Sequence, residues 1–345
     1  MMFRFLRRAH HILRAILNTF LQLPKAVSVA LEKSYYPERR RKGAPRRIAE
    51  NLYWLLRYHE ANVYYNVYGL DLAGAPPLRS YADYFSFAFD RSAKVTRQNY
   101  LLRDKYAFYR YMRSCGIPVI DIIAICNRGR LFTTDFEPLS EESFRKEKDY
   151  FVKESAGECA SFVKHFDDYD AFTAGMKGRN GLHIIQRRLR QCAELDRLNP
   201  AAINTLRIVT VNKGEPYLFS AVLRVGTEMS GSVDNWSVGG FAVGIHEDGT
   251  LKQYAYTKPG YNNMKIERHP DTGVVFSEFK VPMYREAVQL VCRAHRQFYD
   301  IQTIGWDVAI TEEGPVIVEG NDNWAINLHQ VCDGPLRREW EEAIS

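Results

Sequence analysis

The last two predicted strands, Thr303–Ile310 and Pro315–Glu319, constrain the fold more than any other part of the chain. The four residues between them, Thr311 to Gly314, are enough only for the turn of an antiparallel hairpin. Apolar side chains alternate along both strands with the period of two that a half-buried strand requires, and these are Trp306, Val308, Ile310, Val316 and Val318. We therefore expect a β-hairpin with one apolar face.

The alternation also predicts the register of this hairpin, because a slip of one residue would put the two apolar sets on opposite faces. In the favoured register Ile310 pairs with Val316 across a five-residue loop. Counting back from that pair places Asp307 opposite Glu319 on the other face, which Asn321 continues. The remaining neighbours expected on that face are Gly305, Ala309, Pro315 and Ile317.

Two carboxylates that face each other across a pair of strands repel unless a positive charge lies between them. Asp307 and Glu319, together with the amide of Asn321, offer the hard oxygen ligands that Mg²⁺ takes alongside substrate phosphates. The hairpin therefore predicts a magnesium site formed by these three residues. The spacing alone leaves one alternative open, which is an exposed acidic pair beside a turn.

The rest of the chain mixes helices and strands without a regular alternation. Helices are expected at Ile48–Tyr68, Asp104–Cys115 and Met283–Tyr299. Further strands are expected at Val119–Cys126, Tyr150–Lys153, Leu182–Arg187, Thr205–Asn212, Pro216–Arg224, Gly240–His246 and Gly273–Phe276. Runs of adjacent strands followed by helices favour an α+β (mixed α/β) fold over a regular βαβ sheet.

The positive charge of the chain is concentrated at its start. Residues 1–50 contain twelve Lys/Arg against three Asp/Glu, a net charge of +9, whereas the other 295 residues contain 35 against 38. Within this region, residues 3–20 have apolar side chains at helical spacing, and Pro24 is expected to end or kink the helix. The pattern predicts peripheral contact with an anionic membrane through residues 1–24. The alternative is a helix docked on the main body of the protein, with its arginines in solvent. A polysaccharide or another protein also remains a possible partner, and no nucleic acid is expected.

The cysteines and the hydropathy pattern bear on the compartment. The six cysteines are scattered without a CxxC pair, which argues against a zinc site and favours reduced thiols. No stretch has the ~18 to 20 apolar residues that a spanning helix needs, and the early arginines interrupt any signal-peptide core. We expect a cytoplasmic protein, peripheral at the inner face of the membrane.

The residues Gly305-Trp306-Asp307-Val308 and Val318-Glu319-Gly320-Asn321 resemble the C-terminal metal motif of the ATP-grasp superfamily. The nearest likeness is to the sugar-transfer-associated ATP-grasp proteins, which are related to α-L-glutamate ligases, and it covers residues 80–335. The resemblance implies an ATP-grasp fold with a helical N-terminal region, and ATP and Mg²⁺ as cofactors. It also implies three parts: a basic, helical region at 1–80, a nucleotide-covering part at 81–190 and a C-terminal subdomain with the metal site at 191–345.

By the same resemblance, two lysines contact the nucleotide phosphates. Lys105 opens a helix and Lys153 ends a strand, as the corresponding lysines of the family do. Ser155 and Gly157 belong to the loop that covers the phosphates, where backbone N–H groups can bind anions. A single lysine is more often a solvated charge, but two in this order favour a nucleotide site.

The adenine pocket of the family corresponds to the stretch from His183 to Leu189. Gln186 and Leu189 are the matching positions, although packing at a strand end would explain them nearly as well. Glu194 is the expected contact of the ribose.

The family likeness also assigns residues to the reacting groups. Arg207 and Arg224 are the cations expected to steady an acyl phosphate, because a guanidinium binds carboxylate and phosphate through two hydrogen bonds. The alternative for each is an ion pair with a structural carboxylate. Asp234 and Asn235 lie in a loop expected near the acceptor site.

The function that the resemblance implies is an ATP-dependent carboxylate–amine ligase. Such an enzyme forms an acyl phosphate and then a carbon–nitrogen bond, and the family context suggests addition of an amino-acid-like group to a cell-surface polysaccharide or sugar precursor. Two alternatives are an ATP-grasp phosphotransferase and a non-catalytic, nucleotide-binding partner of a polysaccharide assembly complex.

Overall fold

The computed structural model describes residues 2–92, 94–156, 162–228, 236 and 239–345, with the side chains of the first helix from Leu17 onward. The chain divides into two compact units. Unit 1 comprises Met1–Lys94, Val222–Lys280 and Ala325–Ser345, and unit 2 comprises Val95–Ala221 and Val281–Trp324. Among the described residues, no helix is both long and apolar enough to cross a bilayer.

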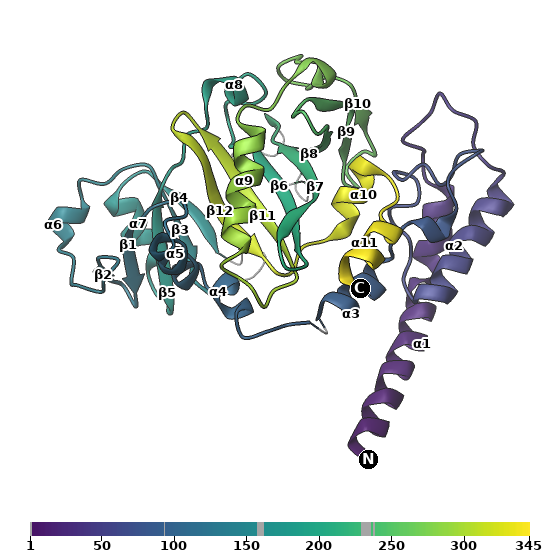
Figure 1. The fold of residues 1–345 in the computed structure, drawn as a ribbon, viewed down its shortest axis with the longest axis horizontal. Helices are drawn as coiled ribbons and strands as arrows, with labels where there is room; N and C mark the ends of the chain where they lie inside the picture. The colour runs from purple at the N-terminus through teal and green to yellow at the C-terminus, as the bar shows by residue number, and fades with distance from the viewer. Residues whose placement is uncertain (1, 93, 157–161, 229–235, 237–238) are drawn as a thin grey trace. The chain divides into compact units, whose positions relative to one another are not determined.

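Unit 1 begins with two helices that pack against each other, α1 (Met2–Leu31) and α2 (Ala44–Tyr58) (Figure 1). Its other helical elements are η1 (Leu78–Ser80), α3 (Tyr84–Ser92), η4 (Phe276–Glu278), α10 (Ile326–Asp333) and α11 (Arg337–Ile344). Its strands are β8 (Phe241–Ile245), β9 (Leu251–Thr257) and β10 (Lys265–Ile266). The core is aromatic, because Trp54, Tyr65, Tyr68 and Tyr81 pack on side chains of the sheet and of α10.

Unit 2 contains a five-stranded antiparallel sheet in the order β2-β1-β5-β3-β4. Its strands are β1 (Ile122–Asn127), β2 (Arg130–Phe132), β3 (Tyr150–Glu154), β4 (Val163–Phe166) and β5 (Leu182–Arg187). The accompanying helices are α4 (Asn99–Arg103), α5 (Lys105–Ser114), α6 (Glu141–Phe144) and α7 (Tyr169–Met176). Tyr150 and Val152 point into a core that Phe144 and Phe172 complete, so Lys153 points to the opposite face.

A second sheet has the order β10-β9-β8-β7-β6-β11-β12. The chain passes between the two units within β7 (Pro216–Val225). Unit 2 contributes β6 (Thr205–Asn212), β11 (Thr303–Thr311) and β12 (Gly314–Asn321), and α8 (Ala193–Asp196) precedes them. Helix α9 (Tyr284–His295) lies across β6, β11 and β12 (Figure 1). The mixed α/β fold expected from the sequence is therefore confirmed.

The expected kink at Pro24 stays a prediction, but the alternative expectation of a helix end there is wrong. Helix α1 continues through Pro24 to Leu31, although an internal proline costs about 3 kcal/mol. Packing offsets this cost, because Ala26, Val29 and Ala30 are fully buried beyond it. The helix expected at Ile48–Tyr68 ends at Tyr58 instead. His59 takes a left-handed conformation (φ 59°) and its N–H bonds to the carbonyl of Leu55, so the tyrosine-rich stretch folds as turns.

The strand expected at Gly273–Phe276 is also wrong. Only a single bridge forms there, between Arg268 and Val275, and Phe276 starts the short helix η4. Gly273 has a φ of +72° and its N–H donates to the carbonyl of His269, so it ends a turn and leaves too few extended residues for a ladder.

Candidate functional site

The β11–β12 hairpin places Asp307 directly opposite Glu319, as expected, but by a different route. Ile310 pairs with Pro315 and not with Val316, because the loop is shorter than predicted and Gly314 adopts a φ of +131°. The register shifts between Asp307 and Val308, which is the signature of a bulge. The bulge restores the pairing of Asp307 with Glu319.

This correction changes which side chains accompany the two carboxylates. Because Pro315 pairs with Ile310 and Ile317 pairs with Val308, both lie on the apolar face and not on the acidic one. Val316 pairs with Ala309 and therefore lies on the acidic face. The pairing of Gly305 with Asn321 keeps the amide on the same face as the two acids.

The two glycines of the motif are required by close packing. A Cβ atom on Gly305 would lie 2.6 Å from the Cβ atom of Trp324, and one on Gly320 would lie 2.9 Å from Leu102 and 3.0 Å from the ring of Trp306. The contact at Gly305 is with an atom next to the backbone, so it cannot move aside easily. The glycines thus let the hairpin lie against its neighbours.

The apolar face of the hairpin is anchored by a buried polar chain. The indole N–H of Trp306 donates to Thr210 Oγ1 (2.8 Å), which lies 2.7 Å from Nδ1 of His295. Nε2 of His295 lies 2.9 Å from the carbonyl of Ile301, so the neutral ring donates there and accepts from Thr210. Burial lowers the pKa of His295 to about 4. The strand that carries Asp307 is therefore held from behind by a neutral histidine.

On the acidic face, Asp307 is already paired with a cation. Arg207 on β6 lies opposite Asp307 on β11, and its Nε and Nη2 donate to the two carboxylate oxygens, the latter at 3.0 Å. Their side chains are 15% and 4% exposed. The ion pair foreseen as the alternative for Arg207 therefore forms, and its partner is the proposed metal ligand.

Lys153 approaches the same carboxylates from β3. Burial lowers the pKa of its ammonium group, and the charges of Glu319 and Asp307 act in the opposite direction. Lys105 is near enough to contribute to the lowering. The structure thus brings together two lysines and two carboxylates that the sequence separates by up to two hundred residues.

A hydrogen-bonded clamp holds Lys105 beside the end of β3. Ser155 Oγ donates to Asp104 Oδ1 (2.8 Å) and accepts from the N–H of Tyr106 (3.1 Å). The N–H of Lys105 donates to the carbonyl of Ser155 (2.8 Å), and Asp104 caps α5 by accepting from Ala107. Ser155 is 1% exposed. Its side chain therefore serves the clamp, and the expected contact with phosphate stays a prediction.

The fit of a divalent cation can be judged from the oxygen donors. Among the described residues, no group of three or more His, Cys, Asp or Glu side chains is arranged to hold a metal. Asp307, Glu319 and Asn321 supply two carboxylates and an amide on one face, a donor set that suits Mg²⁺ with phosphate oxygens. Asn321 Nδ2 donates to Glu319 Oε1 (3.1 Å), so the amide oxygen of Asn321 takes no part in this hydrogen bond. The residues present fit a magnesium ion shared with a nucleotide.

One acidic residue at this end of β12 was not foreseen. Asp322 accepts from Asn99 Nδ2 and from Arg103 Nε (2.9 Å), which ties the end of β12 to helix α4. Asp322 directly follows the motif, and Asn99 and Arg103 are four residues apart on one helix face. The spacing of Asn99 and Arg103 was the sequence signal from which a shared acidic partner could have been predicted. The contact fixes where the strand with Glu319 and Asn321 ends.

The remaining predicted residues are distributed unevenly. Lys153 pairs with Ile184 of β5, and Gln186 lies two residues after Ile184 on the same strand. Gln186 and Lys153 therefore lie on the same face of the small sheet. Leu189 follows β5, and Glu194 is exposed on α8. Arg224 lies on β7 in unit 1, where it pairs with Ala242 of β8. Gly157, Asp234 and Asn235 lie outside the described residues.

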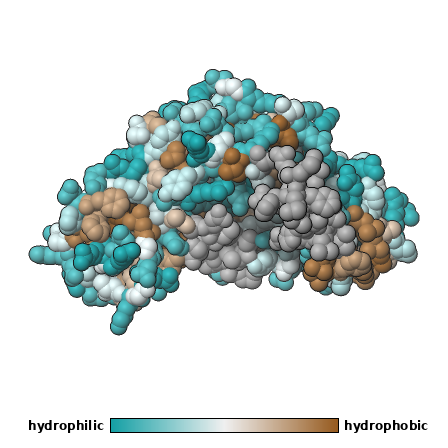
Figure 2. All heavy atoms as spheres, turned by 90° about the horizontal axis from the view of Figure 1, so that it is seen from below, coloured by the Kyte–Doolittle hydropathy of each residue, from teal (hydrophilic) through white to brown (hydrophobic). Residues whose placement is uncertain are grey.

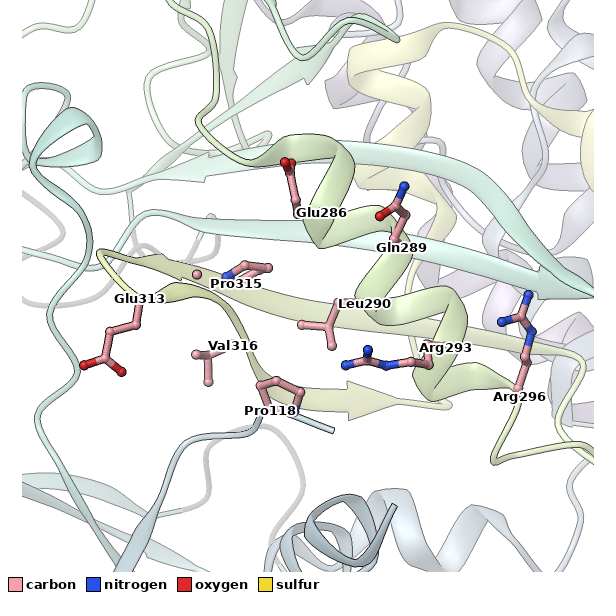
Figure 3. A pocket seen from close by; sticks show the side chains of 10 residues that line it. Pro118, Glu286, Gln289, Leu290, Arg293, Arg296, Glu313, Pro315 and Val316 are labelled. Atoms are coloured by element: carbon pink, nitrogen blue, oxygen red, sulfur yellow. The ribbon is translucent and has the colours of Figure 1, made fainter. Parts of the chain in front are cut away.

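A cleft of about 660 Å³ in unit 2 lies away from these groups. It is lined by α9, the hairpin loop and Pro118 (Figure 3). Trp306 packs on His295 and Phe298 on the α9 side of the sheet, whereas Asp307 points to the other side. The cleft is therefore not the site of the carboxylates and lysines.

Comparison with known proteins gives one family. Residues 161–342, just over half of the chain, match the sugar-transfer associated ATP-grasp family. No curated protein matches.

Solved structures are similar at low identity. D-alanine–D-alanine ligase from Coxiella burnetii shares 11% identity at a TM-score of 0.39, with 70% of this chain and 59% of that one covered. N5-carboxyaminoimidazole ribonucleotide synthetase from Thermotoga maritima shares 10% identity at a TM-score of 0.37, with 65% of this chain and 42% of that one covered. D-alanine–D-alanine ligase from Helicobacter pylori shares 11% identity at a TM-score of 0.40, with 71% of this chain and 60% of that one covered. The chain thus spans less than two thirds of the length of each.

Proposed function

Because the chain belongs to the sugar-transfer associated ATP-grasp family, we propose that unit 2 binds Mg-ATP and activates a carboxylate as its acyl phosphate for attack by an amine. The observation that carries this proposal is the meeting of Lys153 and Lys105 with Glu319 and Asp307. Two cations suit the phosphates of a nucleotide, and two carboxylates suit the metal ion that accompanies it.

The proposed chemistry has two steps. In the first, a substrate carboxylate oxygen attacks the γ-phosphorus of ATP, a new oxygen–phosphorus bond forms, and the bond to the β-phosphate oxygen breaks to release ADP. In the second, an amine attacks the acyl carbon, a carbon–nitrogen bond forms, and inorganic phosphate leaves while the amine proton passes to solvent. Both steps depend on positioning and charge neutralisation more than on a covalent group of the protein.

The residues of unit 2 have separate parts in this scheme. Lys105 and Lys153 neutralise the nucleotide phosphates, and Gln186 lines the adenine pocket with Leu189. Asp307, Glu319 and Asn321 would hold Mg²⁺, which supplies further neutralisation of phosphate charge when bound.

Arg207 has two partners in this proposal. Its guanidinium is paired with the carboxylate of Asp307. Asp307 would hold Mg²⁺ together with Glu319 and Asn321, and Arg207 is proposed to steady the acyl phosphate through two hydrogen bonds. Arg224 is proposed for the same group, Glu194 for the ribose, and Ser155 and Gly157 for the phosphate loop. Asp234 and Asn235 are proposed for the acceptor.

The family description supports a sugar-linked acceptor. We propose that the reaction adds an amino-acid-like group to a cell-surface polysaccharide or sugar precursor, and that it takes place on the cytoplasmic side. The proposal leaves the carboxylate substrate open, and the experiment therefore screens several candidate carboxylates.

Trapping the activated carboxylate tests this proposal. The protein is incubated with Mg-ATP, candidate amino acids or sugar acids, and hydroxylamine, and hydroxamate and ADP are measured together. The proposal expects hydroxamate in amounts that match ADP, and it expects the Lys153→Met variant to form neither. The matched control is Lys164→Met, which changes an exposed lysine of the neighbouring strand β4.

The outcomes separate the alternatives. ADP with a stable phosphorylated product and no hydroxamate would show a phosphotransferase. Mg-ATP binding without turnover across the whole screen would leave only a nucleotide-binding partner.

A further inference from the structure

Two polar side chains of helix α1 are directed toward the rest of unit 1. Asn18 Nδ2 donates to the carbonyl of His59 (2.6 Å), and Thr19 Oγ1 lies 2.9 Å from Nδ1 of the same histidine. Further along the helix, Ala26 is buried against Leu55 of α2. Helix α1 therefore docks on unit 1 through polar and small residues.

The opposite side of α1 is apolar and exposed. Leu17, Phe20, Leu21 and Leu31 are 57%, 70%, 69% and 56% exposed, and we call these four residues the α1 stripe. At ~100° per residue they fall on one side of the helix, whereas Ala26, Val29 and Ala30 fall on the other. Single exposed leucines are ordinary, but four on one helix face form a patch.

Helix α2, against which α1 packs, also exposes apolar side chains. Leu56 is 69% exposed and Tyr53 is 38% exposed. Figure 2 shows hydrophobic surface over the part of unit 1 where α1 and α2 lie.

The charge around the stripe indicates what covers it. Residues 1–24 contain four arginines and no Asp or Glu, and residues 1–50 carry a net charge of +9. A second copy of the chain would bring the same positive charge against itself, so self-association through this face is opposed. An anionic lipid surface offers both acyl chains for the stripe and negative headgroups for the arginines.

We propose that α1 lies in the plane of an anionic membrane, with the α1 stripe and Leu56 in contact with the acyl region. This surface belongs to unit 1 and goes beyond the nucleotide site of unit 2. Two signals act together, as stable membrane anchoring requires: apolar burial and attraction to anionic headgroups.

Vesicle flotation of the full chain tests the proposal. The parent is expected to float with vesicles of phosphatidylcholine and phosphatidylserine, to bind less at high salt, and to bind pure phosphatidylcholine weakly. The triple variant Leu17→Gln/Phe20→Gln/Leu21→Gln keeps the net charge, and its partition constant is expected to fall by about ten-fold or more. Tyr299→Gln, at a 71% exposed position of unit 2, is the matched control and should float like the parent.

Three results would overturn the proposal. The first is a parent chain that does not float with anionic vesicles, and the second is a triple variant that floats as well as the parent. The third is a parent that dimerises without vesicles while the triple variant stays monomeric, since the stripe would then be an interface between copies. Unfolding temperature and Mg-ATP binding of the triple variant should match the parent, which separates this test from that of the nucleotide site.

Discussion

Arg207 and Asp307 face each other across strands β6 and β11, and the guanidinium donates to both carboxylate oxygens. Asp307 in turn faces Glu319 across the hairpin. The positive charge that two opposed carboxylates require is thus supplied by residues of the chain, because Arg207 pairs with Asp307 and Lys153 lies near both acids.

The first prediction concerns the cost of breaking this pair. Asp307→Asn leaves Arg207 half-buried without its charge partner, so we expect a loss of about 3 kcal/mol in the free energy of unfolding. Adding Arg207→Met should recover most of that loss, because the unpaired charge is then removed. Urea unfolding of the parent, Asp307→Asn, Arg207→Met and the double variant measures the coupling energy between the two side chains. Glu313→Gln in the exposed turn is the control. Equal losses in the single and double variants would contradict it.

The same variants should separate stability from turnover. Both Asp307→Asn and the double variant are expected to lose Mg-ATP turnover, since restoring the fold does not restore the negatively charged carboxylate. A double variant that turns over like the parent would remove Asp307 and Arg207 from the site.

The second prediction is an effect of pH on nucleotide affinity. The pKa of Lys153 is lowered from 10.5 by burial, and the charged form is the one that neutralises phosphate. Mg-ATP affinity should therefore weaken as pH rises, at a lower pH than an exposed lysine would require. Lys153→Met should weaken affinity by about ten- to hundred-fold and remove this dependence. Calorimetry measures both quantities, with Lys164→Met as control.

Stability should move the other way for the same residue. Above the lowered pKa of Lys153 the unfolded chain binds more protons at this position than the folded chain, so its contribution to stability rises with pH. An affinity and a stability that fall together with rising pH would contradict the assignment.

The third prediction concerns His295 behind the hairpin. Its pKa is lowered from 6.5 to about 4, so the folded protein holds the neutral ring. Stability is complete above pH ~6.5 and is lost as pH falls toward ~4, by at most roughly 3 kcal/mol. Urea unfolding between these values should show the loss, and His295→Gln should flatten it.

The fourth prediction tests the packing of the motif glycines. Gly305→Ala places a Cβ atom 2.6 Å from that of Trp324, and we expect a loss of about 1–3 kcal/mol. Gly43→Ala is the control, because its nearest new contact is 3.8 Å away and its φ is −59°. Equal effects of the two changes in thermal unfolding would show that Gly305 is not closely packed.

The hairpin also shows how far the sequence could be interpreted. Alternation of Trp306, Val308 and Ile310 predicted the apolar face, and the opposition of Asp307 and Glu319 followed from it. The tighter loop, in which Gly314 takes a φ of +131°, and the bulge that compensates for it could not be predicted, because alternation of apolar residues reports neither turn geometry nor a register shift. The one-residue error in the predicted loop was cancelled by the one-residue register shift at the bulge, so Asp307 still pairs with Glu319.

Elsewhere the limits were of two kinds. Helix α2 ended early because His59 takes a left-handed conformation, for which histidine carries only a weak signal. The pairing of Arg207 with Asp307 joins residues one hundred positions apart, and only the strand order reveals it. Local pattern predicted the elements well, whereas contacts between distant elements needed the fold.

The last prediction decides what Ser155 does. If its hydroxyl acts by clamping Asp104 beside Lys105, as the contacts indicate, Ser155→Ala affects nucleotide binding only through that lysine. The KM for ATP should then rise about three- to ten-fold with little change in kcat, since roughly 1 kcal/mol of hydrogen bonding is lost. A double-mutant cycle with Lys105→Ala checks this, because effects through one residue are not additive.

Additive losses in Ser155→Ala and Lys105→Ala would mean instead that the hydroxyl contacts the nucleotide itself, as the family resemblance implied. Ser155→Thr distinguishes the two further, because it keeps the hydroxyl but adds a methyl group at a position that is 1% exposed. A clamp tolerates that methyl group only if α5 shifts, which changes the position of Lys105. Loss of affinity in Ser155→Thr that disappears in the Lys105→Ala background would therefore assign Ser155 to positioning.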